Sequence, residues 1–213
     1  MADRFEHAEY AGLTALHIVA FAGSLRRGSY NRALVRAAGA LAPEGMTVEP
    51  IEIDALPFYN ADVEARGDPA TVAVFKAALR EADGILIATP EYNDGIPGVL
   101  TNAIDWASRL PGQSPLAGKP VAVMGASPGQ IGTARAQLHL RQLLAHAQAR
   151  TLPPPELIVA AAHTRFDAEL QLTHEPTRKV LAALLERFVN WIGRERAAAE
   201  AERQLAGMIP ASR

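Results

Sequence analysis

Five short apolar runs in the sequence alternate with five segments whose apolar residues recur at helical spacing. The apolar runs are residues 16–21, 46–53, 84–89, 119–126 and 156–162, and the helical segments are residues 29–41, 69–82, 96–110, 133–148 and 177–193. Buried strands of a parallel sheet have this apolar composition and length. The alternation therefore predicts an α/β fold, an open parallel sheet with helices on both faces.

The length, charge and composition of the chain limit its domain organisation and the classes of function that it can have. Its 213 residues fit one domain, which we expect at residues 16–193, between an N-terminal tail at 1–15 and a helical or disordered C-terminal tail at 194–213. The formal net charge is −2, and no basic stripe indicates nucleic-acid binding. The chain contains no cysteine, which excludes disulfides and cysteine catalysis. We expect a cytoplasmic protein, because no stretch resembles a signal peptide or a membrane span.

The turn after the first apolar run, residues 22–31, is rich in glycine and in hydrogen-bond donors. A turn between a strand and a helix exposes backbone N–H groups at the positive end of the helix, which favours anions. The side chains that add to these N–H groups are Ser24, Ser29 and Asn31, with Arg26 or Arg27 as a cation. The turn therefore predicts a phosphate site.

Two phosphate-binding motifs do not match this turn. The dinucleotide fingerprint G-x-G-x-x-G needs a middle glycine that is absent between Gly23 and Gly28. A Walker loop has the same glycine spacing, but Ser29 stands in place of its lysine and Tyr30 in place of its magnesium-binding hydroxyl. The terminal phosphate of a mononucleotide such as FMN remains, and so does an ordinary turn in which Ser29 only caps the helix.

Two further turns, residues 89–95 and 126–132, share the glycine, serine, asparagine and proline content of the first. In a five-stranded sheet of order 2-1-3-4-5, the flavodoxin-like order, ligands bind beyond the carboxyl ends of strands one, three and four. These are the strands that the three turns follow. We therefore expect a doubly wound, flavodoxin-like sheet with a single ligand crevice over those three ends.

The second turn has residues suited to a flat ring. Pro90, Glu91 and Tyr92 would flank the ring, and Tyr92 offers an aromatic surface for packing. Backbone amides from Asn93 to Gly95 could reach ring nitrogen and oxygen atoms, and Gly95 permits close approach. Taken alone, the same turn could equally be an ordinary connection with an exposed tyrosine.

The third turn contains G-x-S-x-G at residues 125–129, the nucleophile elbow of hydrolases. That reaction uses the backbone N–H of the residue after the serine, and Pro128 has none. We therefore interpret Ser127 and Gly129 as a donor and a point of clearance beside a ring edge. The six histidines show no metal-binding spacing such as H-E-x-x-H, so we expect no metal site.

The joint pattern of G-S-L-R-R-G-S-Y-N, T-P-E-Y-N, N-A-I-D-W-A-S-R-L and L-A-G-K-P-V resembles the NADPH-dependent FMN reductase family, and within it the quinone and chromate reductase branch. The resemblance covers about residues 16–192 and implies a flavodoxin-like fold, bound FMN, and NADPH or NADH as hydride donor. It carries phosphate contacts to Ser24, Arg26, Ser29 and Asn31, and ring contacts to Pro90, Glu91, Tyr92, Asn93 and Ser127. The cofactor-binding residues that we expect in total are Ser24, Arg26, Ser29, Tyr30, Asn31, Pro90, Glu91, Tyr92, Asn93, Gly95, Ser127 and Gly129.

The expected activity is therefore that of an FMN-dependent NAD(P)H oxidoreductase. Hydride would pass from NAD(P)H through flavin N5 to a quinone or a similar small molecule, with chromate, azo compounds or free flavin as other acceptors. One open ring face implies a ping-pong mechanism, and no catalytic side chain is required because FMN carries the chemistry. The alternative is a flavodoxin-type electron carrier or a flavin-binding redox sensor.

The resemblance also implies a homodimer or a homotetramer. We expect no nucleic-acid or membrane partner, because the sequence has no basic stripe and no apolar run long enough to span a membrane. The sequence adds a reason of its own in the helical segment at residues 96–110. Its apolar residues Val99, Leu100, Ile104, Trp106 and Leu110 occupy more than one face of the helix. One face must cover the sheet, so the other predicts a contact between subunits.

Overall fold

The computed structural model describes residues 15–109 and 112–208. The strands are β1 (Leu16–Ala22), β2 (Met46–Pro50), β3 (Gly84–Ala88), β4 (Pro120–Ala126), β5 (Arg150–Thr151) and β6 (Leu157–Val159). The helices are α1 (Tyr30–Ala40), α2 (Ala61–Glu64), α3 (Ala70–Glu81), α4 (Gly98–Ser108), α5 (Ala134–His146), the 3-10 turn η1 (Ala162–Thr164) and α6 (Glu175–Met208). The predicted N-terminal tail lies outside these residues except for Ala15.

All the strand pairs in the sheet are parallel, and the strand order is β2-β1-β3-β4-β5. The predicted order 2-1-3-4-5 is therefore confirmed. The fifth predicted strand, at residues 156–162, corresponds to β6, and β5 is an additional two-residue strand that was not predicted; both pair with β4. The three consecutive prolines 153–155 lie between them, and proline has no N–H to donate to a neighbouring strand.

Helices cover both faces of the sheet, as the alternating pattern predicts. Side chains of α1 and α6 pack on one face, around Ile18, Leu86 and Met124. Side chains of α3, α4 and α5 pack on the other face, around Val19, Ile87 and Val123. Successive residues of β1 thus point to opposite cores, which explains why the strands are apolar at nearly every position rather than at alternate ones.

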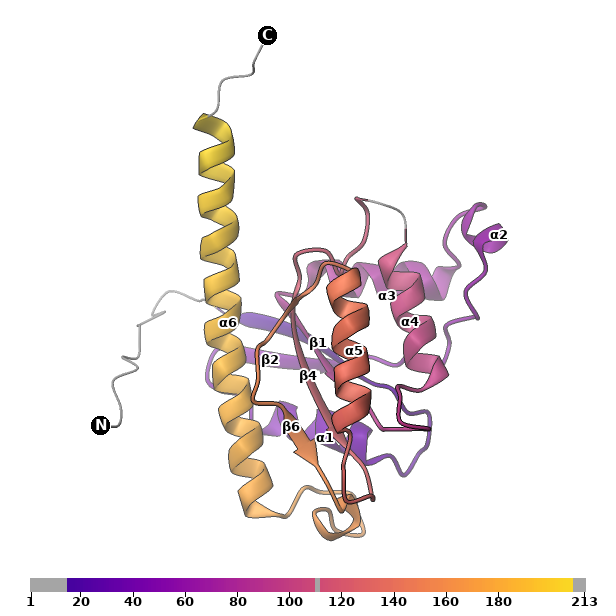
Figure 1. Cartoon of the computed structure of the whole chain (residues 1–213), viewed down its shortest axis with the longest axis vertical. Coiled ribbons are helices and arrows are strands. Elements are labelled where there is room, and N and C mark those ends of the chain that lie inside the picture. The colour runs from indigo at the N-terminus through magenta and orange to yellow at the C-terminus, as the bar shows by residue number, and fades with distance from the viewer. Residues whose placement is uncertain (1–14, 110–111, 209–213) are drawn as a thin grey trace, which may run out of the picture.

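The last helix is longer than the sequence pattern predicts. Its first half packs on the sheet so closely that a Cβ added at Gly84 would lie 2.8 Å from Cζ of Phe188. Its second half extends away from the other elements (Figure 1). Where this half begins, Glu195 forms an ion pair with Arg150, and Arg196 forms one with Asp83. The tail expected to be helical or disordered is therefore helical as far as Met208. No helix in residues 15–109 or 112–208 is long and apolar enough to cross a membrane.

The segment between β2 and α3 is held against α4. The backbone carbonyl of Pro57 accepts hydrogen bonds from the side chains of Asn102 (2.9 Å) and Trp106 (2.8 Å). Trp106 is consequently fully buried within its own chain. Leu100 and Ile104 are buried too, whereas Leu110 lies outside the described residues. Other parts of the same chain thus cover these apolar residues of α4. The prediction that subunits associate therefore needs evidence from residues outside this helix.

Candidate functional site

The turns that follow β1, β3 and β4 meet at one edge of the sheet. They enclose a small cavity of about 50 Å³. Its lining consists of Ser24, Arg26, Ser29, Tyr30, Asn31, Pro90, Glu91, Tyr92, Ala126, Ser127 and Pro128. Of the residues predicted to contact a cofactor, only Asn93, Gly95 and Gly129 do not line it. The structure thus brings together residues that are up to about a hundred positions apart in the sequence.

The first turn prepares the start of α1 for an anion. The hydroxyl oxygen of Ser29 accepts a hydrogen bond from the backbone N–H of Arg32 (3.2 Å), and this caps the helix. That hydroxyl can still donate its proton, because a serine both donates and accepts. The backbone N–H groups of Tyr30 and Asn31 make no hydrogen bond to another backbone group in the described chain. No acidic side chain lies in the first turn of the helix.

The side chain of Asn31 joins two of the three turns. Its amide nitrogen donates to the carbonyl of Ala126 (2.9 Å), and its amide oxygen accepts from the N–H of Ala126 (2.9 Å). Asn31 is 3% exposed, so this pair is shielded from water. The side-chain amide is consequently committed to the end of β4, and Asn31 has its backbone N–H left to offer a ligand.

The second turn is a tight hairpin from Tyr92 to Gly95. These two residues exchange both backbone hydrogen bonds, each of 3.0 Å. Asn93 and Asp94 between them have φ values of 50° and 60°, a left-handed conformation that asparagine and aspartate adopt more readily than most residues. The amide of Gly95 is therefore used inside the turn. The amides of Asn93 and Asp94 remain at its tip, beside a Tyr92 side chain that is 48% exposed.

Glu91 fastens this second turn to α5. Its carboxylate accepts hydrogen bonds from the backbone N–H groups of Arg135 (2.9 Å) and Ala136 (3.0 Å) at the start of that helix. The positive end of a helix stabilises such a carboxylate. Arg135 also forms an ion pair with Asp94. One carboxylate oxygen of Glu91 is thus occupied by the N–H groups at the start of α5.

The third turn packs too tightly for any residue larger than glycine at its start. A Cβ added at Gly125 would lie 2.2 Å from Oγ1 of Thr133 and 2.4 Å from the carbonyl oxygen of Thr89. The hydroxyl of Ser127 accepts from the N–H of Gly129 (3.3 Å). No hydrogen bond joins Ser127 to a histidine in the described chain. The glycine of the G-x-S-x-G pattern is therefore explained by packing, and the serine lacks the partner that a hydrolase would need.

A segment that the sequence analysis did not connect with the site contacts two of the turns that form it, although none of its residues lines the cavity. The segment after β6 pairs with the third turn through the N–H of Ala161 and the carbonyl of Gly129 (3.1 Å). It then brings the ring of Phe166 to 5.3 Å from that of Tyr30. Nothing in the local sequence of residues 160–174 indicates this position, which depends on the path of the chain after β6.

The cavity has room and donors for a small anionic group such as a phosphate. Its volume of about 50 Å³ exceeds the ~10–15 Å³ that a single water molecule needs on the same measure. Two hydroxyls, one guanidinium and the N–H groups at a helix start form the donor set that a phosphate monoester requires. A cavity of this volume is too small for the three rings of a flavin, which would have to lie outside it. The described residues contain no cluster of three or more histidine, aspartate or glutamate side chains suited to a metal.

Comparisons with known proteins identify the family of this chain. Residues 16–164 match the family described as NADPH-dependent FMN reductase. An NAD(P)H-dependent FMN reductase from Pseudomonas aeruginosa is 45% identical over 181 residues, which cover 85% of this chain and 97% of the relative. A 2-hydroxy-1,4-benzoquinone reductase from a Burkholderia species is 42% identical over 178 residues, covering 84% and 97%.

A solved structure gives the same result. FerB, a flavoenzyme NAD(P)H:(acceptor) oxidoreductase from Paracoccus denitrificans, has a TM-score of 0.78 and 36% sequence identity to this chain. The match covers 85% of this chain and 99% of the other.

The pair of hydrogen bonds between Asn31 and Ala126 should stabilise the fold measurably. In Asn31→Ala the buried N–H and carbonyl of Ala126 lose their partners, so we expect the free energy of unfolding to fall by about 1–3 kcal/mol. Urea denaturation of the protein without added cofactor measures this. Arg36→Ala, an exposed change on the same helix, is the control and should have little effect. Equal stability of Asn31→Ala and the unmodified protein would contradict this account of the clamp.

Proposed function

The chain belongs to the NADPH-dependent FMN reductase family, and we propose that it passes hydride from NADPH or NADH to a quinone. It is an FMN-dependent NAD(P)H oxidoreductase. The quinone comes from the printed names of relatives, among them a quinone reductase from Escherichia coli that is 42% identical over 182 residues. We also propose that the enzyme is cytoplasmic, because its hydride donor NAD(P)H is abundant there.

One observation carries the phosphate part of this proposal, namely the small cavity where the three turns meet. Ser24 and Ser29 would donate their hydroxyl protons to the FMN phosphate, and Arg26 would supply the cation. The N–H groups of Tyr30 and Asn31 would add the field of the helix start. The side-chain amide of Asn31 would act on the phosphate only indirectly, by holding the turn against β4.

The other two turns would hold the flavin ring. Tyr92 would border it, and the N–H groups of Asn93 and Asp94 would face its polar edge. Pro90, Ser127 and Gly129 would line the opposite side. Glu91 would keep the second turn in place through its bonds to α5, and Gly95 would close the hairpin. Bound FMN would supply a two-electron relay between donor and acceptor.

The proposed activity is tested by following NADPH oxidation by the purified protein in the presence of FMN and a benzoquinone. We expect repeated turnover with parallel double-reciprocal lines, because donor and acceptor must occupy the same opening in turn. An electron carrier or redox sensor would be reduced once without turnover, and that result would contradict the proposal. Intersecting double-reciprocal lines, together with direct evidence that NADPH and quinone bind at the same time, would show that the two substrates do not share one opening.

The phosphate site is tested by Arg26→Ala. We expect FMN binding to weaken by about 1.5–3 kcal/mol, the value typical of a hydrogen bond to a charged group. Riboflavin, which lacks the phosphate, should bind both proteins alike, and titration of flavin fluorescence measures each affinity. Arg27→Ala is the matched control, because Arg27 lines a different cavity and should not alter FMN binding. Unchanged FMN affinity in Arg26→Ala would show that Arg26 does not bind the phosphate.

We also propose that copies of this chain assemble as a homodimer or homotetramer. The support is the exposure of two large apolar side chains, Phe58 in the segment after β2 (87% exposed) and Val74 on α3 (71% exposed). Large exposed apolar side chains are typical of contact surfaces. Light scattering at micromolar concentration should show at least a dimer, and Phe58→Ser should shift it toward the monomer. A monomeric unmodified protein would rule the assembly out.

A further inference from the structure

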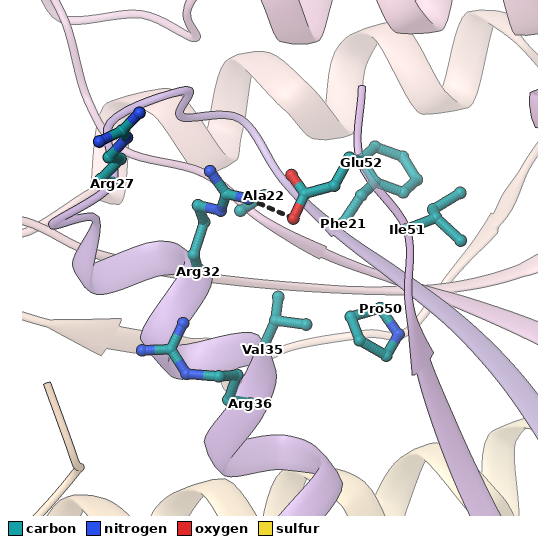
Figure 2. Close-up of a pocket in the computed structure, with 9 residues that line it drawn as sticks. All are labelled: Phe21, Ala22, Arg27, Arg32, Val35, Arg36, Pro50, Ile51 and Glu52. Carbon is teal, nitrogen blue, oxygen red and sulfur yellow. Dashed lines mark hydrogen bonds and ion pairs between the residues drawn. The ribbon is translucent and has the colours of Figure 1, made fainter. Parts of the chain in front are cut away.

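Basic side chains line cavities on two sides of the molecule. One cavity, shown in Figure 2, lies beside α1, and its charged lining residues are Arg27, Arg32, Arg36 and Glu52. Arg32 and Glu52 form an ion pair there, drawn as a dashed line. Arginine stays protonated near neutral pH and is not a nucleophile. The opposite edge of the sheet offers more chemistry, because a lysine lines the cavities there.

This lysine, Lys119, lies directly before β4, at the amino ends of the strands. It lines two adjoining cavities of about 440 and 370 Å³, which share Arg80, Ala117 and Lys119. The phosphate site lies at the other end of β4, where Ala126 and Ser127 line it. The seven residues of β4, at about 3.3 Å each, separate the two places by roughly 20 Å. The cavities at Lys119 are therefore distinct from the proposed cofactor site.

The amine of Lys119 is held by the end of α3. Its Nζ donates hydrogen bonds to the backbone carbonyls of Arg80 (2.9 Å) and Ala82 (2.5 Å). The last carbonyls of a helix have no partner within the helix, so Lys119 provides one for them. A neutral amine has two N–H groups, which these two carbonyls can accept, and its lone pair then points away from both. The contacts thus orient a nucleophile without using its lone pair.

The surroundings of Lys119 favour this neutral form. Burial lowers the pKa of the Lys119 ammonium below its ordinary value, and Arg196 lowers it further, whereas Asp83 raises it. Asp83 is itself held in an ion pair with Arg196. The other charged residues that line the same cavity are Arg80 and Glu81, at the end of α3. Only the neutral amine of a lysine attacks an electrophile, so a larger neutral fraction makes Lys119 more reactive.

The larger of the two cavities suits an anionic reagent. Its charged lining residues in the described chain are Arg80 and Lys119, without an acidic residue. The guanidinium of Arg80 makes one long hydrogen bond, of 3.5 Å to the carbonyl of Gln113, and has further N–H groups that can bind a phosphate. The volume lies within the ~300–1,000 Å³ typical of sites for small molecules. An acyl phosphate fits this description, because it combines a phosphate with a reactive carbonyl carbon.

We propose that Lys119 is a site of acylation by acyl phosphates, which the larger cavity binds through Arg80. The lysine nitrogen attacks the carbonyl carbon and forms an amide, while the bond from that carbon to the phosphate oxygen breaks. The proton that the nitrogen loses goes to the departing inorganic phosphate. The proposal goes beyond the oxidoreductase function and does not depend on it.

Acylation changes the contacts at the end of α3. The amide nitrogen carries one N–H and no charge, so either Arg80 or Ala82 loses its hydrogen-bond partner. Because α3 packs Phe75 and Leu79 into the core on one face of the sheet, a weaker helix end lowers the stability of the fold. The cofactor site at the other edge of the sheet is left intact.

The first test uses the other two lysines of the chain as internal controls. Lys179 is exposed on α6, whereas Lys76 is 3% exposed and forms an ion pair with Asp68. The FMN-loaded protein is incubated with acetyl phosphate near neutral pH, and mass spectrometry follows each lysine. We expect Lys119 to react at least about fivefold faster than Lys179, because burial favours its neutral form and the donor is held beside it. Lys76 should stay unmodified, and a rate at Lys119 no higher than at Lys179 would overturn the proposal.

The second test separates binding of the phosphate from reactivity of the amine. Arg80→Ala keeps the backbone carbonyl that Lys119 contacts and should slow acetylation of Lys119 by acetyl phosphate several-fold. The uncharged reagent N-hydroxysuccinimidyl acetate should modify Lys119 equally fast in this variant and in the unmodified protein. Arg66→Ala, which removes an exposed arginine from another segment, should change neither rate. An unchanged rate with acetyl phosphate in Arg80→Ala would show that the cavity does not bind the phosphate, and the proposal would fail.

The third test is thermal melting after the same treatment. Acetyl phosphate should lower the Tm of the unmodified protein by about 2–4 °C, the shift expected for one lost hydrogen bond in a chain of this size. Lys119→Arg keeps a charged donor at this position but removes the amine, so its Tm should stay constant. An equal fall of Tm in both proteins would place the destabilising modification elsewhere and overturn this role of Lys119.

Discussion

The site depends on two hydrogen bonds between the side chain of Asn31 and the backbone of Ala126. These residues are 95 positions apart, and the bonds fix the start of α1 against the end of β4. A buried amide that is paired through both its nitrogen and its oxygen rigidifies its surroundings, because opening it would leave polar groups without partners. Glu91 does the same for the second turn and α5. Two internal polar contacts therefore bring three turns together and leave the cavity between them lined with donors.

Most of the fold could be predicted from the sequence, because a sheet buried on both faces gives uninterrupted apolar runs such as β3 and β4. The order of the strands followed from the alternation with helices and from which turns carry polar residues. Two departures have local causes. The short strand β5, which was not predicted, is separated from β6 by the prolines at 153–155. The polar second half of α6 has no apolar face that would reveal its length. The sequence also could not predict that Trp106 is buried under the segment after β2. This burial depends on a hydrogen bond to the backbone carbonyl of Pro57, which any residue could provide.

The candidate site was predicted in its position more completely than in its details. The sequence around Ser29 predicts two roles for it, capping the helix and donating a hydrogen bond to a ligand. One hydroxyl can do both, because it accepts one hydrogen bond and donates another. The sequence could not show that the side chains of Asn31 and Glu91 are committed to other parts of the protein. Nor could it show that Arg26 and Arg27 serve different cavities, because adjacent residues of a turn can point in unrelated directions. These details depend on contacts between segments distant in sequence.

The central claim is that the small cavity where the three turns meet holds the phosphate of FMN. A crystal structure of the protein with FMN tests it most directly, because phosphorus and its oxygens are easily located. The account predicts the phosphate between Ser24, Arg26 and Ser29, at the start of α1, with the ring over the second and third turns. A phosphate found instead among Arg27, Arg32 and Arg36 would contradict it.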